Sequence, residues 1–480
     1  MSSLKFGTSG LRGLVSDLAG WPSYAYSLAF LRYLGVAEIV CGRRALLVGR
    51  DLRSSSPEIA GLVLAAAEAG GFEPVDCGAL PTPALALAAL EHRAPAIMVT
   101  GSHIPDDRNG LKFYLPTGEI GKADEAGILE AFLALREDDL LEFEALAEWK
   151  RPAVSFDATT PYVERYAAFF GPHALEGLTV GIYQHSSVAR DILVDVLAKL
   201  GARTITYGRS ESFIPVDTEA HRPEDIALLR EWAGEGRCDA FVSTDGDADR
   251  PLVADAAGHV LRGDVIGLLT ARHLGLSTIV TPVTSSSAIE RSGIASSVRR
   301  TKVGSPFVIA GMEEGGRAGE AGIVGFEANG GLLLGSDIEL FGRWLAALPT
   351  RDSVLPILAV LAEIAATQKT LSAIVDGLEA GFTAAHRLKE VEATASGPFL
   401  ARLAEDEAYR RAFFRPVDDV EDVNRVDGVR TTLASGETVH YRASGNAPEL
   451  RCYVEAASEE AATRLLEWGL GAAQAALDRS

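Results

Sequence analysis

The chain has 480 residues, of which 45 are basic and 66 are acidic, so its formal net charge at pH 7 is −21. Such a charge argues against nucleic acid or an anionic membrane as the main partner, although a local group of arginines can still bind a small anion. The first residues show no apolar signal-peptide segment, and no apolar run reaches the roughly 18 residues that a membrane span needs. Four widely spaced cysteines without a CxxC pair indicate reduced thiols rather than a disulfide framework or a zinc site, and hence a cytoplasmic protein.

The N-terminal part alternates short apolar strands with helical segments. RALLVGRD (residues 44–51) predicts a buried strand, and FEPVDCG (72–78) predicts the next one. Between them, residues 56–69 predict a helix with Ser56 as its N-cap and Pro57 in its first position. This order of strand, helix and strand is typical of a mostly parallel sheet covered by helices.

The same pattern returns twice, in residues 178–208 and 277–304, at a spacing of about a hundred residues. Serine clusters occupy equivalent places in the three copies: Ser54–Ser56, Ser186–Ser187 and Ser285–Ser287. After about Asp376 the segments become shorter, as in DVNRVDGVRTTL, and predict antiparallel strands. We therefore expect an α/β protein with three related domains that contain mixed, mostly parallel sheets (1–152, 153–258 and 259–375), followed by an α+β domain (376–480).

DGDADR (residues 245–250) follows the apolar run CDAFVST, which predicts a buried strand. Asp245, Asp247 and Asp249 then lie at the carboxyl end of that strand, where open α/β sheets bind ligands. Three carboxylates on a short loop suit a divalent cation of the magnesium type. Arg250 would add a phosphate donor beside the metal. The alternative interpretation is a solvated acidic turn.

TGSHIP (residues 100–105) also follows an apolar run, PAIMVT. Ser102 would project from the top of the sheet, with His103 and the later Lys112 supplying positive charge or proton transfer. Its hydroxyl could attack phosphorus if a metal and cations stabilised the developing charge. The alternative is a polar turn with an N-capping serine. No GxSxG motif and no Asp and His partners for an acyl-transfer triad are identifiable.

Three further loops carry polar groups between glycines. RASGNAPELRCY (442–453) resembles an anion cradle before a strand, GFEANGG (325–331) offers a carboxylate and an amide to vicinal sugar hydroxyls, and FGTSGLRG (6–13) presents Arg12 to a phosphate. Each of the first two could instead be an ordinary turn. The nucleotide motif GxxxxGK[ST], an initial GxGxxG and the metalloprotease motif HExxH are absent from the sequence.

Together and in this order, these motifs resemble those of the α-D-phosphohexomutase family, which contains phosphomannomutases and phosphoglucomutases. The resemblance extends from residue 6 to residue 451, and TGSH, the following NGLK and DGDADR are its specific parts. It implies four domains around a central cleft and a phosphoserine at Ser102. It also implies Mg²⁺ held by the three aspartates and a phosphoserine oxygen, and interconversion of hexose 1- and 6-phosphates through hexose 1,6-bisphosphate. FGTSGLRG and GFEANGG look most like bacterial phosphomannomutases, with phosphoglucomutase or a dual-specificity mutase as the alternative.

The resemblance also implies roles for individual residues. Arg12, Lys112 and Arg250 would stabilise the transferring group, and His103 or Lys112 would handle the hydroxyl proton. The residues that the resemblance assigns to sugar recognition and to the distal phosphate are Glu327, Asn329, Gly304, Ser305, Arg442, Ser444, Gly445, Asn446 and Arg451.

The sequence departs from the family pattern at three places. The sugar loop has Asn329 where the family often has serine and Gly331 where it has histidine, KVGSPF has Ser305 where many members carry histidine, and TPVTSSS (281–287) has no lysine. A metal-dependent phosphatase and a non-catalytic sugar-phosphate-binding paralogue are the competing classes, but the intact Ser102 and aspartates favour the mutase. The expected partners are small sugar phosphates, and the expected assembly is a monomer or a homodimer.

Overall fold

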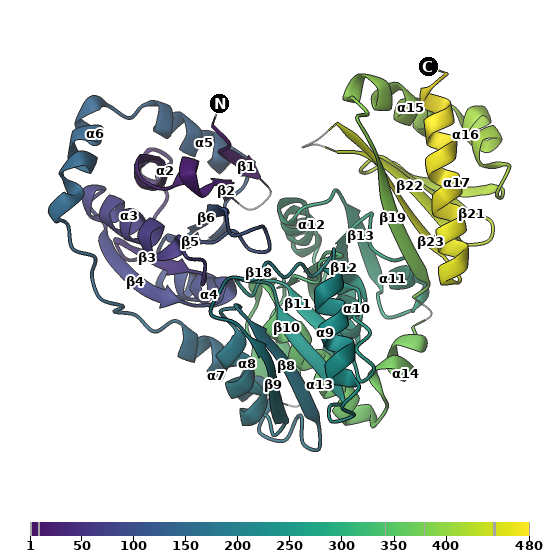
Figure 1. The fold of residues 1–480 in the computed structure, drawn as a ribbon, viewed down its shortest axis with the longest axis horizontal. Coiled ribbons are helices and arrows are strands. Elements are labelled where there is room, and N and C mark those ends of the chain that lie inside the picture. Colours follow the sequence, from purple (N-terminus) through teal and green to yellow (C-terminus); the bar gives the residue numbers. More distant parts are fainter. Residues whose placement is uncertain (1, 8–9, 341, 379, 445–447, 480) are drawn as a thin grey trace.

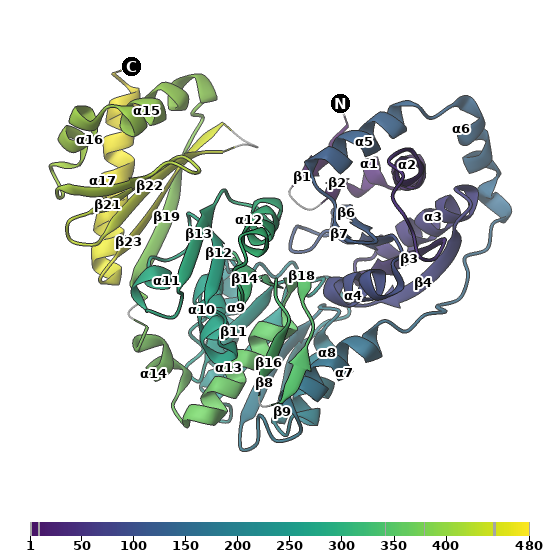
Figure 2. The ribbon, with the colours of Figure 1, turned by 180° about the vertical axis from the view of Figure 1, so that it is seen from behind.

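The computed structural model describes residues 2–7, 10–340, 342–378, 380–444 and 448–479. Four units follow one another along the chain and form an arc, with the first unit at one end and the last at the other (Figure 1). The view from behind shows the same order, with the second and third units side by side in the middle (Figure 2).

The first unit contains a seven-stranded sheet in the order β1-β2-β6-β5-β3-β4, with β7 paired to β6. Its elements are β1 (Lys5–Gly7), β2 (Gly10–Leu14), α1 (Val15–Leu18), α2 (Trp21–Val36), β3 (Ala45–Arg50), α3 (Ser56–Ala69), β4 (Glu73–Ala79), α4 (Thr82–His92), β5 (Ala96–Val99), β6 (Arg108–Leu115), β7 (Gly118–Glu119), α5 (Lys122–Leu133), α6 (Glu137–Glu144) and the 3₁₀ turn η1 (Ala145–Glu148).

The second unit has a four-stranded sheet in the order β11-β10-β8-β9. Its elements are α7 (Thr159–Phe170), β8 (Thr179–His185), α8 (Arg190–Lys199), β9 (Arg203–Arg209), α9 (Pro223–Ala233), β10 (Ala240–Thr244) and β11 (Pro251–Asp255).

The third unit has a five-stranded sheet in the order β13-β12-β14-β15-β18 and a separate hairpin, β16-β17. Its elements are α10 (Gly263–Leu274), β12 (Thr278–Pro282), α11 (Ala288–Arg291), β13 (Ser297–Thr301), α12 (Ser305–Arg317), β14 (Ile323–Phe326), β15 (Leu332–Leu334), β16 (Ile338–Leu340), β17 (Arg343–Leu345), β18 (Leu348–Asp352), α13 (Val354–Thr367) and α14 (Leu371–Asp376).

The fourth unit has an antiparallel sheet in the order β19-β23-β22-β21-β20, and α15, α16 and α17 cover one of its faces (Figure 1). Its elements are β19 (Phe382–Lys389), α15 (Ala393–Glu405), α16 (Glu407–Phe414), β20 (Val420–Asn424), β21 (Val429–Leu433), β22 (Thr438–Ala443), β23 (Glu449–Ala456) and α17 (Glu459–Leu477).

The first three units share one topology. In each, a central strand (β3, β8 or β12) pairs in parallel with the next strand on one side and with the third strand (β5, β10 or β14) on the other. The third strand then pairs antiparallel with a fourth, which is β6, β11 or β15. The predicted fold class, three related α/β domains followed by an α+β domain, is confirmed. The exact domain limits stay a prediction.

The sheet of the first unit is buried on both faces, as its nearly continuous apolar strands predict. Along β3, Leu46 and Val48 pack with α2 and α3, whereas Ala45 and Leu47 face the other side with α4. The core on the α4 side continues through the second unit into α10 and α13 of the third. The first three units therefore share one apolar core, while the fourth has its own, between its sheet and its helices.

One local prediction was wrong. Ser56 is the first residue of α3 rather than its N-cap, which is Ser55 and makes no side-chain cap. The Ser56 hydroxyl instead donates a hydrogen bond to Asp51 Oδ1, at 2.5 Å, so it faces the strand end rather than the helix amides. Among the described helices, none is long and apolar enough to cross a membrane.

Candidate active site

Ser102 lies on the loop between β5 and β6, with its side chain fully shielded from solvent. Its φ of 55° is in the left-handed region, which costs a residue other than glycine about 1–3 kcal/mol and needs support from its surroundings. The amide of Ser102 donates to Thr100 Oγ1 at 2.8 Å, and its hydroxyl donates to Asp245 Oδ2 at 2.5 Å. The serine of the first unit is thus aimed at the acidic loop of the second.

The acidic loop joins β10 to β11, and its three aspartates are all fully buried. One oxygen from each of Asp245, Asp247 and Asp249 can be chosen so that the three lie within 4.8 Å of one another. Burial raises the pKa of Asp245 well above its usual range, and the adjacent negative charges of Asp247 and Asp249 raise it further. Three such carboxylates need positive charge nearby.

The donor set fits Mg²⁺. Asp247 Oδ1 and Asp249 Oδ1 are buried, and each is without a hydrogen-bond partner within the part of the chain that the structure describes. Buried carboxylate oxygens without donors are costly unless a cation binds them. Three such residues on a short loop match the hard oxygen ligands that Mg²⁺ prefers.

Lys112 on β6 provides a cation on the other side of the aspartates. Its Nζ lies 2.5 Å from Asp247 Oδ2 and 2.6 Å from Asp249 Oδ2. Burial alone would raise the pKa of Asp249, but the positive charges of Arg351, Lys112 and Arg250 outweigh it and lower that pKa. The acidic loop is therefore held by the first and third units as well as by its own.

His103 and Arg250 lie next to Ser102 in the site. Arg250 Nη1 lies 3.0 Å from His103 Nδ1 and therefore donates to it, and Ser102 Oγ lies 3.2 Å from the same nitrogen. Burial, and then the charge of Arg250, lower the pKa of His103 to about 3, so the imidazole is neutral at pH 7. Its Nε2 lies 4.0 Å from Asp217 Oδ2.

Arg12 lies on β2 and points into the same group of charges. Burial and, after it, the positive charges of Arg250 and Arg351 together lower its pKa to about 10, against the attraction of Asp247 and Asp249. The structure thus brings together Arg12, Ser102, His103, Lys112, Arg250 and the three aspartates, which the sequence places up to 238 positions apart (250 − 12).

The sugar loop joins β14 to β15, the connection equivalent to the Ser102 loop and the acidic loop. Glu327 is buried and its Oε2 accepts a hydrogen bond from Gly304 N at 3.1 Å. Asn329 Oδ1 accepts from Gly331 N at 3.0 Å, and the Asn329 carbonyl accepts from Thr218 Oγ1 of the second unit. Ser305 is fully buried at the start of α12, and its hydroxyl has no partner among the described residues.

The fourth unit contributes β22 and β23. Arg442 Nε donates to Asp427 Oδ2 at 2.7 Å, and the same oxygen accepts from Val303 N of the third unit at 3.1 Å. Arg451 lies on the neighbouring strand. Ser444 follows β22, and its amide donates to the carbonyl of Glu449. Gly445 and Asn446 lie outside the described residues.

A cleft of about 1030 Å³ joins these parts. It is lined by residues of all four units, among them His103, Glu219, Arg262, Ala328 and Arg451. The uncovered face of the fourth sheet, from β19, β22 and β23, forms one wall. The expected central cleft is therefore present, and residues of the Ser102 loop, the sugar loop and the fourth unit lie on its borders.

Sequence reasoning missed several residues that hold the site. Thr82 Oγ1 donates to Asp247 Oδ2 at 2.6 Å, Ser353 Oγ donates to the Ala248 carbonyl, and Arg351 lies 2.9 Å from Asp249 Oδ2. Arg53 is buried beneath the Ser102 loop. Thr82 and Ser353 each follow a strand and precede or begin a helix, whereas the Ser102, acidic and sugar loops each join two strands.

Known protein families match this chain over most of its length. Four domains of the phosphoglucomutase/phosphomannomutase family match: α/β/α domain I over residues 3–139, domain II over 160–258, domain III over 262–381 and the C-terminal domain over 388–467. The chain belongs to this family. It is therefore an enzyme of the phosphohexomutase type, an isomerase, as the sequence motifs predict.

Individual phosphohexomutases show how far the likeness extends. A phosphomannomutase of Sinorhizobium fredii is 48% identical over 469 residues, which cover 97% of this chain and 98% of that one. A phosphomannomutase of Salmonella muenchen is 38% identical and covers 100% of this chain and 97% of its own. The crystal structure of a phosphoglucomutase/phosphomannomutase family protein from Burkholderia thailandensis, 22% identical, superposes with a TM-score of 0.76 over 98% of this chain and 97% of that chain.

Proposed function

We propose that the enzyme interconverts hexose 6-phosphate and hexose 1-phosphate, with Ser102 as the phosphoryl carrier. The observation that carries this proposal is the 2.5 Å hydrogen bond from the Ser102 hydroxyl to Asp245, inside a fully buried aspartate cluster. A serine that only capped a turn would need no carboxylates from another domain. A phosphoryl carrier needs a cation beside it, and the aspartates are the residues that would hold one.

The transfer step balances without a further reactant. A sugar hydroxyl oxygen forms a bond to phosphorus, the bond from phosphorus to Ser102 Oγ breaks, and the hydroxyl proton ends on Ser102 Oγ. We infer that His103, whose Nδ1 lies 3.2 Å from that oxygen, or Lys112 carries the proton, and His103 can do so only when its Nδ1 no longer accepts from Arg250 Nη1. The hexose 1,6-bisphosphate formed then turns over in the cleft and returns its other phosphate to Ser102.

Charge on the transferring group is neutralised by nearby cations. Asp245, Asp247 and Asp249 would hold Mg²⁺, which when bound lowers the energy of the phosphoryl group's developing charge. Arg12 on β2, Lys112 on β6 and Arg250 just before β11 all interact with the charge of Asp249. Burial of this cluster keeps water away from the phosphoserine, which favours transfer to sugar over hydrolysis.

The far end of the cleft would bind the other phosphate. Arg442, Ser444, Gly445, Asn446 and Arg451 would hold it, while Glu327, Asn329, Gly304 and Ser305 would recognise the sugar. Glu327 supports this assignment because it is buried beside the cleft and has one oxygen fixed by Gly304 N, so its orientation is set before substrate arrives.

We assign mannose phosphates as the preferred substrates. The support is the identity of 48% and 38%, over nearly the whole chain, to two phosphomannomutases. The free cysteines of the described chain support a cytoplasmic location. A monomer or a homodimer is the expected assembly.

The test compares kcat/KM for mannose 1-phosphate and glucose 1-phosphate, with the matching 1,6-bisphosphate and Mg²⁺ supplied. We expect a higher value for the mannose substrate. Near-equal values would identify a dual-specificity enzyme, and release of inorganic phosphate in place of isomerisation would identify a phosphatase instead.

A further inference from the structure

Arg53, three residues beyond the end of β3, lies beneath the Ser102 loop and is 1% exposed. Its guanidinium donates to the main-chain carbonyl of the serine and to those of three residues that follow it. Nη2 donates to Ser102 O at 2.9 Å and Ile104 O at 2.6 Å, and Nη1 donates to Pro105 O at 2.8 Å and Arg108 O at 3.1 Å. One side chain therefore binds three carbonyls of the Ser102 loop and the carbonyl of Arg108, the first residue of β6.

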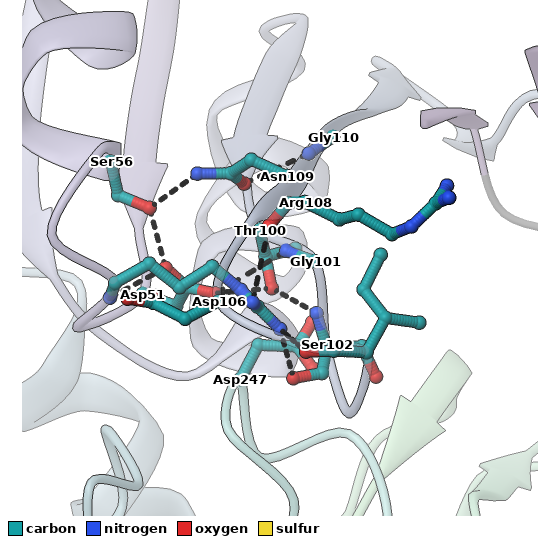
Figure 3. Close-up of polar contacts among 12 residues, drawn as sticks. Asp51, Ser56, Thr100, Gly101, Ser102, Asp106, Arg108, Asn109, Gly110 and Asp247 are labelled. Atoms are coloured by element: carbon teal, nitrogen blue, oxygen red, sulfur yellow. Dashed lines mark hydrogen bonds and ion pairs between the residues drawn. The ribbon is translucent and has the colours of Figure 1, made fainter. Parts of the chain in front are cut away.

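Asp51 holds Arg53 in place and also supports the start of the loop. Its Oδ2 accepts from Arg53 Nε at 3.1 Å, from Thr100 Oγ1 at 2.9 Å and from Gly101 N at 3.3 Å. Thr100 Oγ1 in turn accepts from Ser102 N. Figure 3 shows Asp51 between Ser56 and Thr100, with Ser102 beyond. The aspartate and the arginine thus fix the loop from opposite ends.

The guanidinium is also packed on both faces. A Cβ on Gly101 would lie only 2.6 Å from Arg53 Cζ, so the glycine is required by the close approach of the arginine. On the other face, the Phe213 ring of the second unit lies 3.9 Å from Arg53 Cζ, a cation–π contact. A Cβ on Gly246, in the acidic loop, would meet both Ser102 O and Phe213.

We propose that Arg53 is a positioning residue for phosphoryl transfer: it holds Ser102 in its left-handed conformation and, through Phe213, fixes the serine loop against the acidic loop. This inference rests on the proposed function of Ser102. Arg53 itself does not reach the cleft, so it acts through the position of Ser102 Oγ. A planar, five-donor group is needed because four carbonyls and one carboxylate must be satisfied at once, which a lysine cannot do.

The test is the substitution Arg53→Lys, with Arg410→Lys as the matched control. Arg410 is also a buried arginine that donates to two main-chain carbonyls, Leu403 O and Ala404 O, but it lies in the fourth unit on the helix side of the sheet. We expect kcat to fall about 100-fold for Arg53→Lys, as displacements of about 1 Å at a reacting centre do, with KM changed by less than about threefold. Arg410→Lys should keep the wild-type kcat.

Two further readouts separate positioning from a general loss of structure. The rate at which hexose 1,6-bisphosphate phosphorylates Ser102, measured per chain by intact mass, should fall in parallel with kcat. Amide hydrogen exchange in residues 100–108 should speed up in Arg53→Lys while exchange in the fourth unit stays as in the wild type. This exchange readout does not depend on turnover, so it tests the loop support even if the wild type acts on neither hexose phosphate, a result that would contradict the proposed function instead.

Wild-type kcat in folded Arg53→Lys, or equal losses in Arg53→Lys and Arg410→Lys, would overturn the proposal. If Arg53→Lys does not fold, Phe213→Leu removes the aromatic face and leaves the arginine. We expect this variant to lose kcat by a smaller factor with KM unchanged, and an unchanged kcat there would equally overturn the proposed role.

Discussion

The two ends of the cleft are built differently. At one end, Ser102 and the three aspartates are fully buried within units that share a continuous apolar core. At the other end, Arg442 and Arg451 lie on a sheet whose core is its own, and Arg442 keeps part of its side chain exposed. We infer from this difference that the reacting groups are fixed in advance, whereas the arginines proposed to hold the distal phosphate lie on a unit with its own core.

The joint between the third and fourth units is polar. Glu455 on β23 accepts hydrogen bonds from Ser286 Oγ and from the amide and hydroxyl of Ser287. Asp427 joins Arg442 to Val303 across the same joint. Domains joined by polar contacts without a shared apolar core commonly move relative to one another, so we expect the fourth unit to move against the other three. The following variants test this contrast.

The largest effect is expected for Ser102→Ala, at the fixed end. Removing the phosphoryl carrier should lower kcat by orders of magnitude while the fold survives, because the side chain is small and makes few packing contacts. A coupled assay for hexose 6-phosphate measures it, with the exposed Ser54→Ala as control. Full activity in Ser102→Ala would remove Ser102 from the mechanism.

Asp247→Asn should have the second-largest effect. Mutation of a residue that hydrogen-bonds to a metal ligand typically lowers metal affinity by roughly 10–100-fold. Loss of a carboxylate charge from a ligand itself should weaken the apparent Mg²⁺ affinity by more than that. Titration of activity with Mg²⁺ measures the shift. Asp239→Asn, an exposed aspartate at the opposite end of β10, is the matched control. An unchanged metal titration for Asp247→Asn would count against the metal loop.

Glu327→Gln tests the recognition side. A hydrogen bond to a charged group contributes about 1.5–3 kcal/mol, which corresponds to a factor of about 10–100. We expect kcat/KM for mannose 1-phosphate to fall by that factor. Phosphorylation of Ser102 by the sugar bisphosphate should stay near the wild-type level. The exposed Glu339→Gln of the same unit should behave as the wild type. An unaltered kcat/KM would exclude Glu327 from sugar recognition.

Asp427→Asn should give the smallest effect, because its ion pair with Arg442 is partly exposed. Loss of about 0.5–1.5 kcal/mol of hydrogen bonding should raise KM by a factor of about 2–10 and leave kcat less changed. A drop in kcat with constant KM would contradict the idea that this joint orients the phosphate-binding arginine.

Local patterns in the sequence were sufficient to predict the three-fold repeat and the positions of the loops. Helix α3 begins and ends as predicted, and the Ser102, aspartate and Glu327 loops all follow apolar strands because those strands end at one edge of each sheet. Their convergence could not be derived from spacing, since it depends on how three separate sheets pack. The prediction that the loops converge on one cleft came from the family resemblance.

The supporting residues escaped prediction for a physical reason. Arg53 contacts carbonyls 49 to 55 positions away, and Thr82 contacts Asp247 at a separation of 165, so nothing nearby in the chain marks them. The sequence does show Asp51 and Arg53 just after a strand, and a glycine before Ser102. Only the fold reveals that this glycine makes room for that arginine. The prediction for Ser56 was wrong for a different reason, because its hydroxyl donates to Asp51, only five positions earlier, and not to a helix amide.

The role of Ser102 as phosphoryl carrier is tested most directly by locating the phosphate on the enzyme. The wild-type enzyme is incubated with mannose 1,6-bisphosphate and Mg²⁺, digested, and the peptide containing residues 99–114 is sequenced by tandem mass spectrometry. We expect one phosphate on Ser102, which is lost on addition of mannose 1-phosphate as the sugar bisphosphate forms. Turnover with Ser102 unmodified throughout, or a phosphate on another residue, would contradict it.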